Sequence, residues 1–157
     1  MKMETREKRF VVDHMLGRMA RWLRLLGFDT RCERLQDSNQ VEAFRREGFI
    51  IITRNRRWYT ESQVLTPSSN DSMAQLVEVI AQASISPTEI KPFRRCILCN
   101  CRLESLSRDC VLGRVPDYVY ETYARFSTCP GCGRIYWPGS HSRRMSDRLH
   151  RLLGWVL

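Results

Sequence analysis

The sequence predicts an α/β domain with a parallel sheet between helices, followed by a small zinc-binding module. Apolar, strand-like runs alternate with helix-like runs through the first half of the chain, and this alternation is typical of a parallel sheet covered by helices. Two Cys-x-x-Cys motifs follow in the second half, at 96–99 and 129–132. We therefore expect one domain at residues 1–90 and a second at 94–157.

Each element of the first domain has its own signal. The run at 49–52, Phe-Ile-Ile-Ile, has the uniform apolarity of a strand buried on both faces. An apolar stripe at helical spacing identifies the first helix, which Gly27 ends. Asp37 with Gln40 forms a capping-box pair for the second. The expected order is strand 9–12, helix 15–26, strand 29–33, helix 37–47, strand 49–52, strand 63–65 and helix 72–83.

The second module has fewer signals. Residues 87–92 have the composition of a linker, and residues 115–126 alternate in polarity and are rich in aromatic side chains. Residues 146–156 form an amphipathic pattern that predicts a terminal helix. Its apolar side carries Leu149, Leu152, Leu153 and Val156.

The cysteine spacing predicts a structural zinc site. Two residues between cysteines allow both sulfurs to reach one ion at about 2.3 Å, and four thiolates make a closed tetrahedral site. The expected ligands are Cys96, Cys99, Cys129 and Cys132. Cys101 is the alternative to Cys99. Seven cysteines is an odd number, and this usage favours a reducing cytoplasm over a disulfide framework.

Charge indicates an anionic partner. The chain has 26 Lys and Arg against 17 Asp and Glu, a net charge of +9. Arginine binds phosphate with two parallel hydrogen bonds, so a nucleic acid is the expected partner. The alternative is that arginine is simply abundant in this proteome. No apolar run approaches the roughly 20 residues that a membrane helix needs, so we expect no membrane association.

Oxygen-bearing side chains follow four predicted strands. Asp13, Asp37, Asn55 and Asp71 each come soon after a strand, and ligands bind open parallel sheets outside the carboxyl ends of the strands. Such ligands suit Mg²⁺ or Mn²⁺, and a pair of these ions can assist phosphodiester hydrolysis. The alternative is that the three aspartates are helix N-caps. His14 is a possible proton carrier or a structural residue.

Two arginine clusters could hold a phosphate backbone. One recurs every third residue along the first helix, and the other surrounds Asn55 beside Trp58 and Tyr59. Charge combined with aromatic stacking is how single strands are bound without much sequence preference. The alternatives are a solvated helix face and aromatic rings that pack a loop onto the sheet. The clusters are Arg18, Arg21 and Arg24, and Arg54, Arg56 and Arg57.

Four stretches of the chain resemble the Mut7-C family. Residues 10–30 read FVVDHMLGRMARWLRLLGFDT, residues 51–57 read IITRNRR, residues 95–100 read RCILCN and residues 129–141 read CPGCGRIYWPGSH. The resemblance implies a PIN-like, three-layer α/β/α ribonuclease domain fused to a C-terminal zinc ribbon.

The resemblance also assigns roles to residues. It implies that Asp13, Asp37 and Asp71 occupy the acidic metal positions, and that Arg18, Arg21 and Arg24 belong to the signature helix. Where the family usually has Thr-Arg-Asp, this chain has Thr53-Arg54-Asn55. An amide brings no negative charge, so a site that contains Asn55 is expected to hold a divalent ion less tightly.

The expected function is that of a metal-dependent ribonuclease that hydrolyses RNA phosphodiester bonds. Asp13, Asp37 and Asp71 would hold Mg²⁺ or Mn²⁺ with help from Asn55, and the zinc would be structural. One alternative is a non-catalytic RNA-binding module whose metal site has decayed. A second is an adaptor that uses the zinc ribbon to dock proteins. A homodimer is possible.

Overall fold

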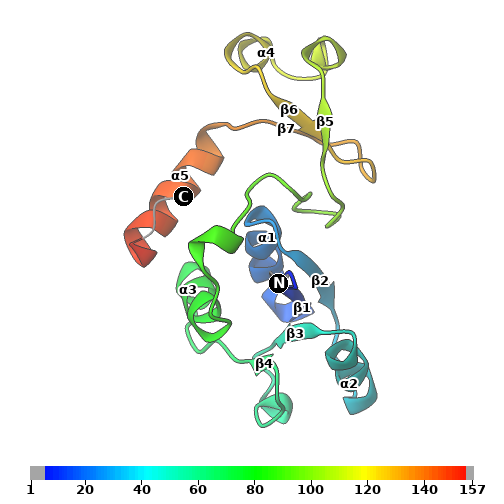
Figure 1. Ribbon diagram of the computed structural model, residues 1–157, viewed down its shortest axis with the longest axis vertical. Helices are drawn as coiled ribbons and strands as arrows, with labels where there is room; N and C mark the ends of the chain where they lie inside the picture. The colour runs from blue at the N-terminus through cyan, green and yellow to red at the C-terminus, as the bar shows by residue number, and fades with distance from the viewer. Residues whose placement is uncertain (1–5, 155–157) are drawn as a thin grey trace, which may run out of the picture.

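The computed structural model describes residues 6–154 and contains two separate β-sheets (Figure 1). The larger sheet belongs to the first half of the chain, and a small antiparallel sheet lies at one end of the molecule. The prediction of a mixed α/β fold with a parallel sheet is confirmed. Within residues 6–154, no helix is long and apolar enough to cross a membrane.

The larger sheet is parallel throughout and has the strand order β2-β1-β3-β4. β1 is central, because it pairs with both β2 and β3, and in this register Asp13 lies beside Glu33. All four strands therefore end at the same edge, and the residues that follow them gather there. The strands are β1 (Arg9–Asp13), β2 (Asp29–Glu33), β3 (Phe49–Ile52) and β4 (Val64–Leu65).

Three α-helices follow strands of this sheet, close to their predicted positions. The helix predicted at 15–26 begins with a 3₁₀ turn, His14–Leu16, whose N-cap Asp13 makes no side-chain cap hydrogen bond. Gly27 closes this helix, at a φ of +99° and with the Lys91 carbonyl so close that a Cβ would clash with it. The helices are α1 (Gly17–Leu25), α2 (Ser38–Arg46) and α3 (Ser72–Gln82).

The helices cover both faces of the sheet, which makes three layers (Figure 1). Phe10 and Val12 of β1 point to the face covered by α1 and α3, and they join the larger apolar core. Val11, between them, points to the opposite face and packs with Val41 of α2. This alternation along one strand buries β1 on both sides, as the uniformly apolar sequence predicts.

The second module contains the antiparallel sheet β5-β6-β7. Within the aromatic-rich stretch 115–126, the structure has a helix rather than an extended run, because Pro116 and Asp117 start a helical turn. This helix packs Val119 against Val111 and Phe126 in a small core of its own. The elements are β5 (Glu104–Leu106), α4 (Asp117–Thr122), β6 (Phe126–Thr128) and β7 (Ile135–Tyr136).

The last helix, α5 (Ser140–Leu153), returns to the first domain. It begins before the predicted residue 146, and it ends because Gly154 adopts a left-handed φ of +68°. The predicted end at Val156 lies outside the described residues. Met145 and Leu149 of α5 are buried in the core formed by α1 and α3, so the first domain takes part of its core from the range 94–157.

The two Cys-x-x-Cys turns, at 96–99 and 129–132, are called knuckles below. The first knuckle is hydrogen-bonded to the edge strand of the larger sheet. Asn100 follows Cys99, and its Oδ1 accepts the Thr30 backbone N–H of edge strand β2 at 3.0 Å. The Asn100 Nδ2 donates to Asp29 Oδ1 at 2.7 Å. Arg24 of α1 donates to the carbonyl oxygens of Ile97 and Leu98 at 3.0 and 3.1 Å. The knuckle therefore covers polar groups that the edge strand would otherwise expose.

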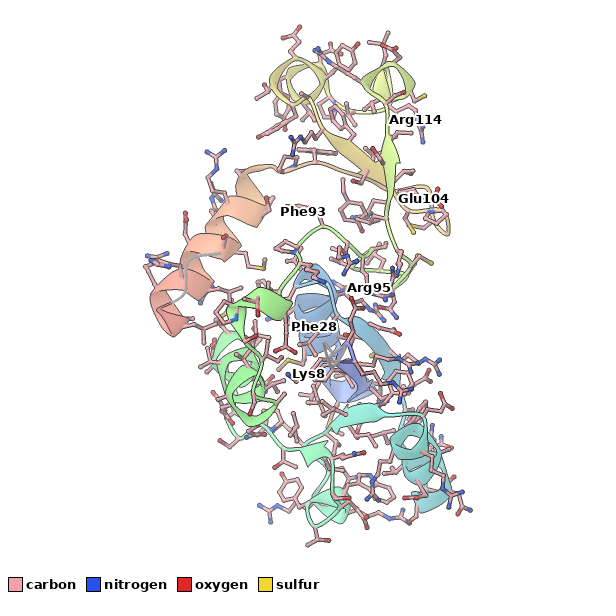
Figure 2. The ribbon with its side chains drawn as sticks, in the orientation of Figure 1. Lys8, Phe28, Phe93, Arg95, Glu104 and Arg114 are labelled. Atoms are coloured by element: carbon pink, nitrogen blue, oxygen red, sulfur yellow. The ribbon has the colours of Figure 1, made fainter. Side chains whose placement is uncertain are left out.

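Asp29 lies at the centre of this junction. Burial raises the pKa of its carboxyl group, but the Asn100 amide and the nearby Arg95 and Arg9 guanidinium groups outweigh burial and hold the pKa below its usual value. Figure 2 shows Arg95 between the two sheets, where it contributes to this arrangement. Asp29, the first residue of β2, is thus a charged contact between the two modules.

We expect Asn100→Gly to loosen this junction while it preserves the knuckle. Asn100 has a φ of +63°, which glycine adopts without strain, so the substitution removes mainly the two side-chain hydrogen bonds. The loss should lower the free energy of unfolding by about 1–3 kcal/mol. Denaturant unfolding measures this change, and hydrogen exchange should show faster exchange of the Thr30 amide. An unchanged Thr30 exchange rate would contradict the assignment.

Candidate functional site

Four cysteines form the clearest metal-binding group. The Sγ atoms of Cys96, Cys99, Cys129 and Cys132 lie within 4.8 Å of one another, and Cys96 and Cys132 are 3.8 Å apart. A tetrahedron with Zn–S bonds of about 2.3 Å has edges of about 3.8 Å, so the geometry fits zinc. Cys101 lies outside the group, although its sulfur is near Gly131.

Local turns and a tyrosine shape this group. The residues after the two knuckles, Asn100 and Gly133, have φ values of +63° and +71°, so each knuckle closes through a left-handed residue. The Tyr136 hydroxyl lies 3.0 Å from Cys96 Sγ. Burial raises the pKa of Cys96, but hydrogen bonds from Tyr136 and from backbone amides lower it below the usual value of a thiol. A thiolate is the form that binds zinc.

Asp13 is buried at the carboxyl end of the central strand. Its exposure is 2 %, and its Oδ2 accepts the Thr53 hydroxyl at 2.8 Å. The Nδ1 of His14, which is itself exposed, lies 3.1 Å from Asp13 Oδ1. A buried carboxylate needs such partners to offset its desolvation. Because Asp13 caps no helix, the N-cap alternative does not explain this residue.

The other two aspartates are N-caps. Asp37 Oδ1 accepts the Gln40 N–H of α2, and Asp71 Oδ2 accepts two N–H groups at the start of α3. Asn55 Oδ1 accepts the Arg57 N–H in the same manner. Asp37 and Asp71 are exposed, and each keeps one carboxylate oxygen outside these cap bonds.

These acids do not form a closely spaced group in this conformation. Among residues 6–154, the cysteine cluster is the only set of three or more His, Cys, Asp or Glu residues whose ligand atoms lie close enough together to hold a metal. The oxygen chemistry of Asp13, Asp37 and Asp71 suits Mg²⁺ or Mn²⁺. Their joint role as metal ligands therefore stays a prediction.

The predicted arginines have different surroundings. Arg18, Arg21 and Arg56 are exposed. Arg54 is held by the loop before α3, since it donates to Asn70 Oδ1 at 3.0 Å and to the Ser68 carbonyl at 3.3 Å.

Arg24 and Arg57 are engaged within the fold. Arg24 binds the cysteine knuckle and the Thr30 carbonyl. Arg57 donates to the Gln36 carbonyl and lies over the Trp58 ring. Trp58 is 2 % exposed in the core beside α2, so it packs the loop onto the sheet, as the structural alternative held.

Sequence reasoning missed two residues beside Asp13. Thr53 directly follows β3, is fully buried, and donates to the Asp13 carboxylate. Glu33 ends β2 and lies beside Asp13 in the sheet register. A lone threonine directly after the apolar run at 49–52 was a signal for the first, because a buried hydroxyl there requires a polar partner.

Comparison with known protein families decides the identity of the chain. The model of the Mut7-C RNAse domain matches residues 8–149. The chain belongs to the Mut7-C family. Comparisons with curated proteins and with solved structures found no match.

The match to the Mut7-C model runs through both modules of the chain. It covers the parallel sheet, the cysteine knuckles and most of α5, which are the parts that the Asn100 junction and the shared apolar core join. The family description indicates a ribonuclease-like function with RNA as the substrate. The four cysteines could hold a metal such as zinc.

We expect the purified Mut7-C protein to contain one zinc ion per chain. Cys129→Ser should lose the metal and unfold the second module, because a structural zinc supplies folding free energy directly. Cys101→Ser is the matched control and should keep its zinc. Elemental analysis and thermal unfolding give the result. Zinc retained in Cys129→Ser, or lost in Cys101→Ser, would contradict the ligand set.

Thr53→Val should destabilise the fold by about 1–3 kcal/mol, because it leaves a buried carboxylate oxygen of Asp13 without its donor. Thr53→Ser keeps the hydroxyl and should be closer to the parent protein. Urea unfolding of the three proteins measures the difference. A larger loss in Thr53→Ser than in Thr53→Val would show that the methyl group, rather than the hydrogen bond, carries the stability.

Proposed function

We propose that the chain is a metal-dependent ribonuclease that hydrolyses RNA phosphodiester bonds at the carboxyl edge of its parallel sheet. The observation that carries the proposal is the position of Asp13. It is a buried carboxylate at the end of the central strand, held by Thr53, in a chain of the Mut7-C RNAse domain family. The parallel three-layer arrangement supports a PIN-like fold for this domain.

The proposed site combines Asp13 with the acids at neighbouring strand ends. Asp37 and Asp71 each have one carboxylate oxygen beyond their cap bonds, and Asn55 offers an amide oxygen. Mg²⁺ or Mn²⁺ held by these oxygens would supply an activated water and neutralise charge on the phosphate. Thr53 fixes the orientation of Asp13, and the exposed His14 imidazole can accept or donate a proton beside it.

Arginine side chains near this edge support RNA as the substrate. Arg18, Arg21 and Arg56 are exposed, and Arg54 is oriented by the loop before α3. Guanidinium groups bind phosphate oxygens in pairs and can hold the strand while the bond is cleaved. Arg24 would act on RNA binding only indirectly, because its guanidinium group holds the first cysteine knuckle in place.

The second candidate function is RNA binding without cleavage. Two observations favour it: Asn55 brings an amide where the family usually has a carboxylate, and the acids are not closely grouped in residues 6–154. A site with less negative charge binds divalent ions more weakly. The arginines would still bind RNA in such a protein.

One assay separates the two candidates. Wild-type protein incubated with labelled single-stranded RNA and Mn²⁺ should cleave it, and Asp13→Asn should lower the rate by at least about a hundredfold, because a positioned carboxylate contributes on this scale. Asn55→Asp should cleave faster and bind Mn²⁺ more tightly by calorimetry, because it adds a charge.

The controls distinguish a lapsed enzyme from an active one. Cleavage by Asn55→Asp but not by the wild type would identify a lapsed nuclease that binds RNA. Equal cleavage by the wild type and Asp13→Asn would show a contaminating nuclease and refute the proposed site. Filter binding of uncleaved RNA by Asp13→Asn confirms that the variant is folded and still binds.

A further inference from the structure

A cavity lies beside the proposed catalytic edge, and the sequence did not predict it. It has a volume of about 490 Å³ and lies between the start of α1 and the loop before α3, within the range of about 300–1,000 Å³ usual for small-molecule sites. No carboxylate lines it. Its lining is Met15, Leu16, Gly17, Arg18, Met19, Arg54, Asn70, Ser72 and Gln75.

Two guanidinium groups give this cavity an affinity for anions. Arg18 comes from α1, and Arg54 from the loop after β3. Two carboxylates of the neighbouring loop and helix are engaged with backbone N–H groups: Asp71 caps α3, and Glu78 accepts the amides of Ser68 and Ser69 at 2.6 and 2.9 Å. A phosphate between the two arginines would therefore meet few competing negative groups.

The wall formed by the loop at 68–71 is rigid before any ligand arrives. Glu78 holds its amides, Arg54 donates to Asn70 and to the Ser68 carbonyl, and Gln75 Nε2 donates to the Ser69 carbonyl at 2.7 Å. A wall tied at these points loses little conformational freedom when it binds. The cavity is thus shaped in advance for one kind of ligand.

Gln75 supplies a hydrogen-bond acceptor at the cavity wall. The residue is 7 % exposed, and its amide nitrogen is committed to Ser69. Among residues 6–154 no donor reaches its Oε1, although the side chain lines the cavity. An acceptor at the cavity wall favours a ligand that brings an N–H group to it, because the complex then gains a hydrogen bond.

Asn70 and Ser72 add further polar groups, and the apolar part of the lining comes from α1 and the turn before it. Leu16 and Met19 are buried side chains of the core, whereas Met15 is 54 % exposed beside them. Methionine and leucine side chains pack well against aromatic faces. The cavity therefore offers an apolar floor, a cationic mouth and one amide acceptor, and these three features match the parts of a nucleotide.

We propose that this cavity is a nucleotide subsite that holds one unit of the RNA next to the cleaved bond. Arg18 and Arg54 bind its phosphate, and the Gln75 Oε1 accepts a hydrogen bond from an exocyclic amino group of its base. Uracil is disfavoured, since its single ring N–H is flanked by two carbonyl oxygens that repel the Gln75 oxygen. This inference rests on the proposed RNA-directed function and adds a base preference to it.

The test measures binding without cleavage, in buffer that contains no Mg²⁺ or Mn²⁺ and with zinc retained. Calorimetry and NMR titrations compare cytidine 5′-monophosphate, uridine 5′-monophosphate and inorganic phosphate, because the two nucleotides share ring size and differ only in the groups at C4 and N3 of the base. We expect the cytidine nucleotide to bind about three- to tenfold more tightly than the uridine nucleotide. Both should bind more tightly than phosphate alone, and the Gln75 side-chain amide signal should shift.

Variants assign each part of the pocket. Arg18→Ala should weaken both nucleotides and phosphate by about tenfold or more, whereas Arg114→Ala, at the far end of the small sheet (Figure 2), should change nothing. Gln75→Met keeps the length of the side chain and should remove the preference for cytidine. Because it also removes the Nε2 bond to Ser69, the measured quantity is the ratio of the two nucleotide affinities. Thermal unfolding confirms that each variant is folded.

Short RNAs distinguish an RNA subsite from a site for free nucleotides. A cytidine tetranucleotide should bind more tightly than the mononucleotide and shift the same signals. Equal binding of all three small ligands, no shift at Gln75, or a tetranucleotide that does not compete would each overturn the subsite. Nucleotide binding without RNA cleavage in the Mn²⁺ assay would refute the nuclease and leave the subsite standing. RNA cleavage without nucleotide binding would support the nuclease and refute the subsite.

Discussion

The bond between Asn100 and the edge of β2 is the contact on which the arrangement of the two modules depends. Asn100 can reach the Thr30 amide only because it adopts a left-handed turn directly after Cys99. A zinc ion on the four cysteines would hold that turn in place. Metal binding in one module would thereby fix a polar cover on the exposed edge strand of the other.

Arg24 extends the same junction to the proposed catalytic edge. Its guanidinium joins the knuckle carbonyls to the Thr30 carbonyl, and it lies on α1, the helix that starts just after Asp13 and His14. The periodic arginines of this helix therefore divide their roles: Arg24 faces inward to the second module, and Arg18 faces the cavity. Arginines at the same three-residue spacing along α1 therefore have two different surroundings.

The parts of the fold that depend on local pattern were predictable. Uniformly apolar runs identified β1 and β3, and the cysteine spacing identified the metal cluster. The position of α5 was not predictable, because its burial arises from Met145 and Leu149 packing against α1 and α3, which lie far earlier in the chain. The role of Asp29 was likewise not predictable, since its partner Asn100 is far away in the sequence.

In the candidate site too, features set by local sequence were predictable, whereas contacts between distant residues were not. Sequence placed Asp13 correctly at a strand end, and the alternative of helix caps was right for the cap bonds of Asp37 and Asp71. Cap bonds and metal coordination are compatible, because a carboxylate has two oxygens and a cap uses one. Each cap fixes its carboxylate to the start of a helix. Forming a shared metal site from Asp13, Asp37 and Asp71 therefore requires α2, α3 or the loops before them to shift. In the proposed ribonuclease, bound RNA and its divalent ions would have to favour that shift against the hydrogen bonds that tie the loop before α3.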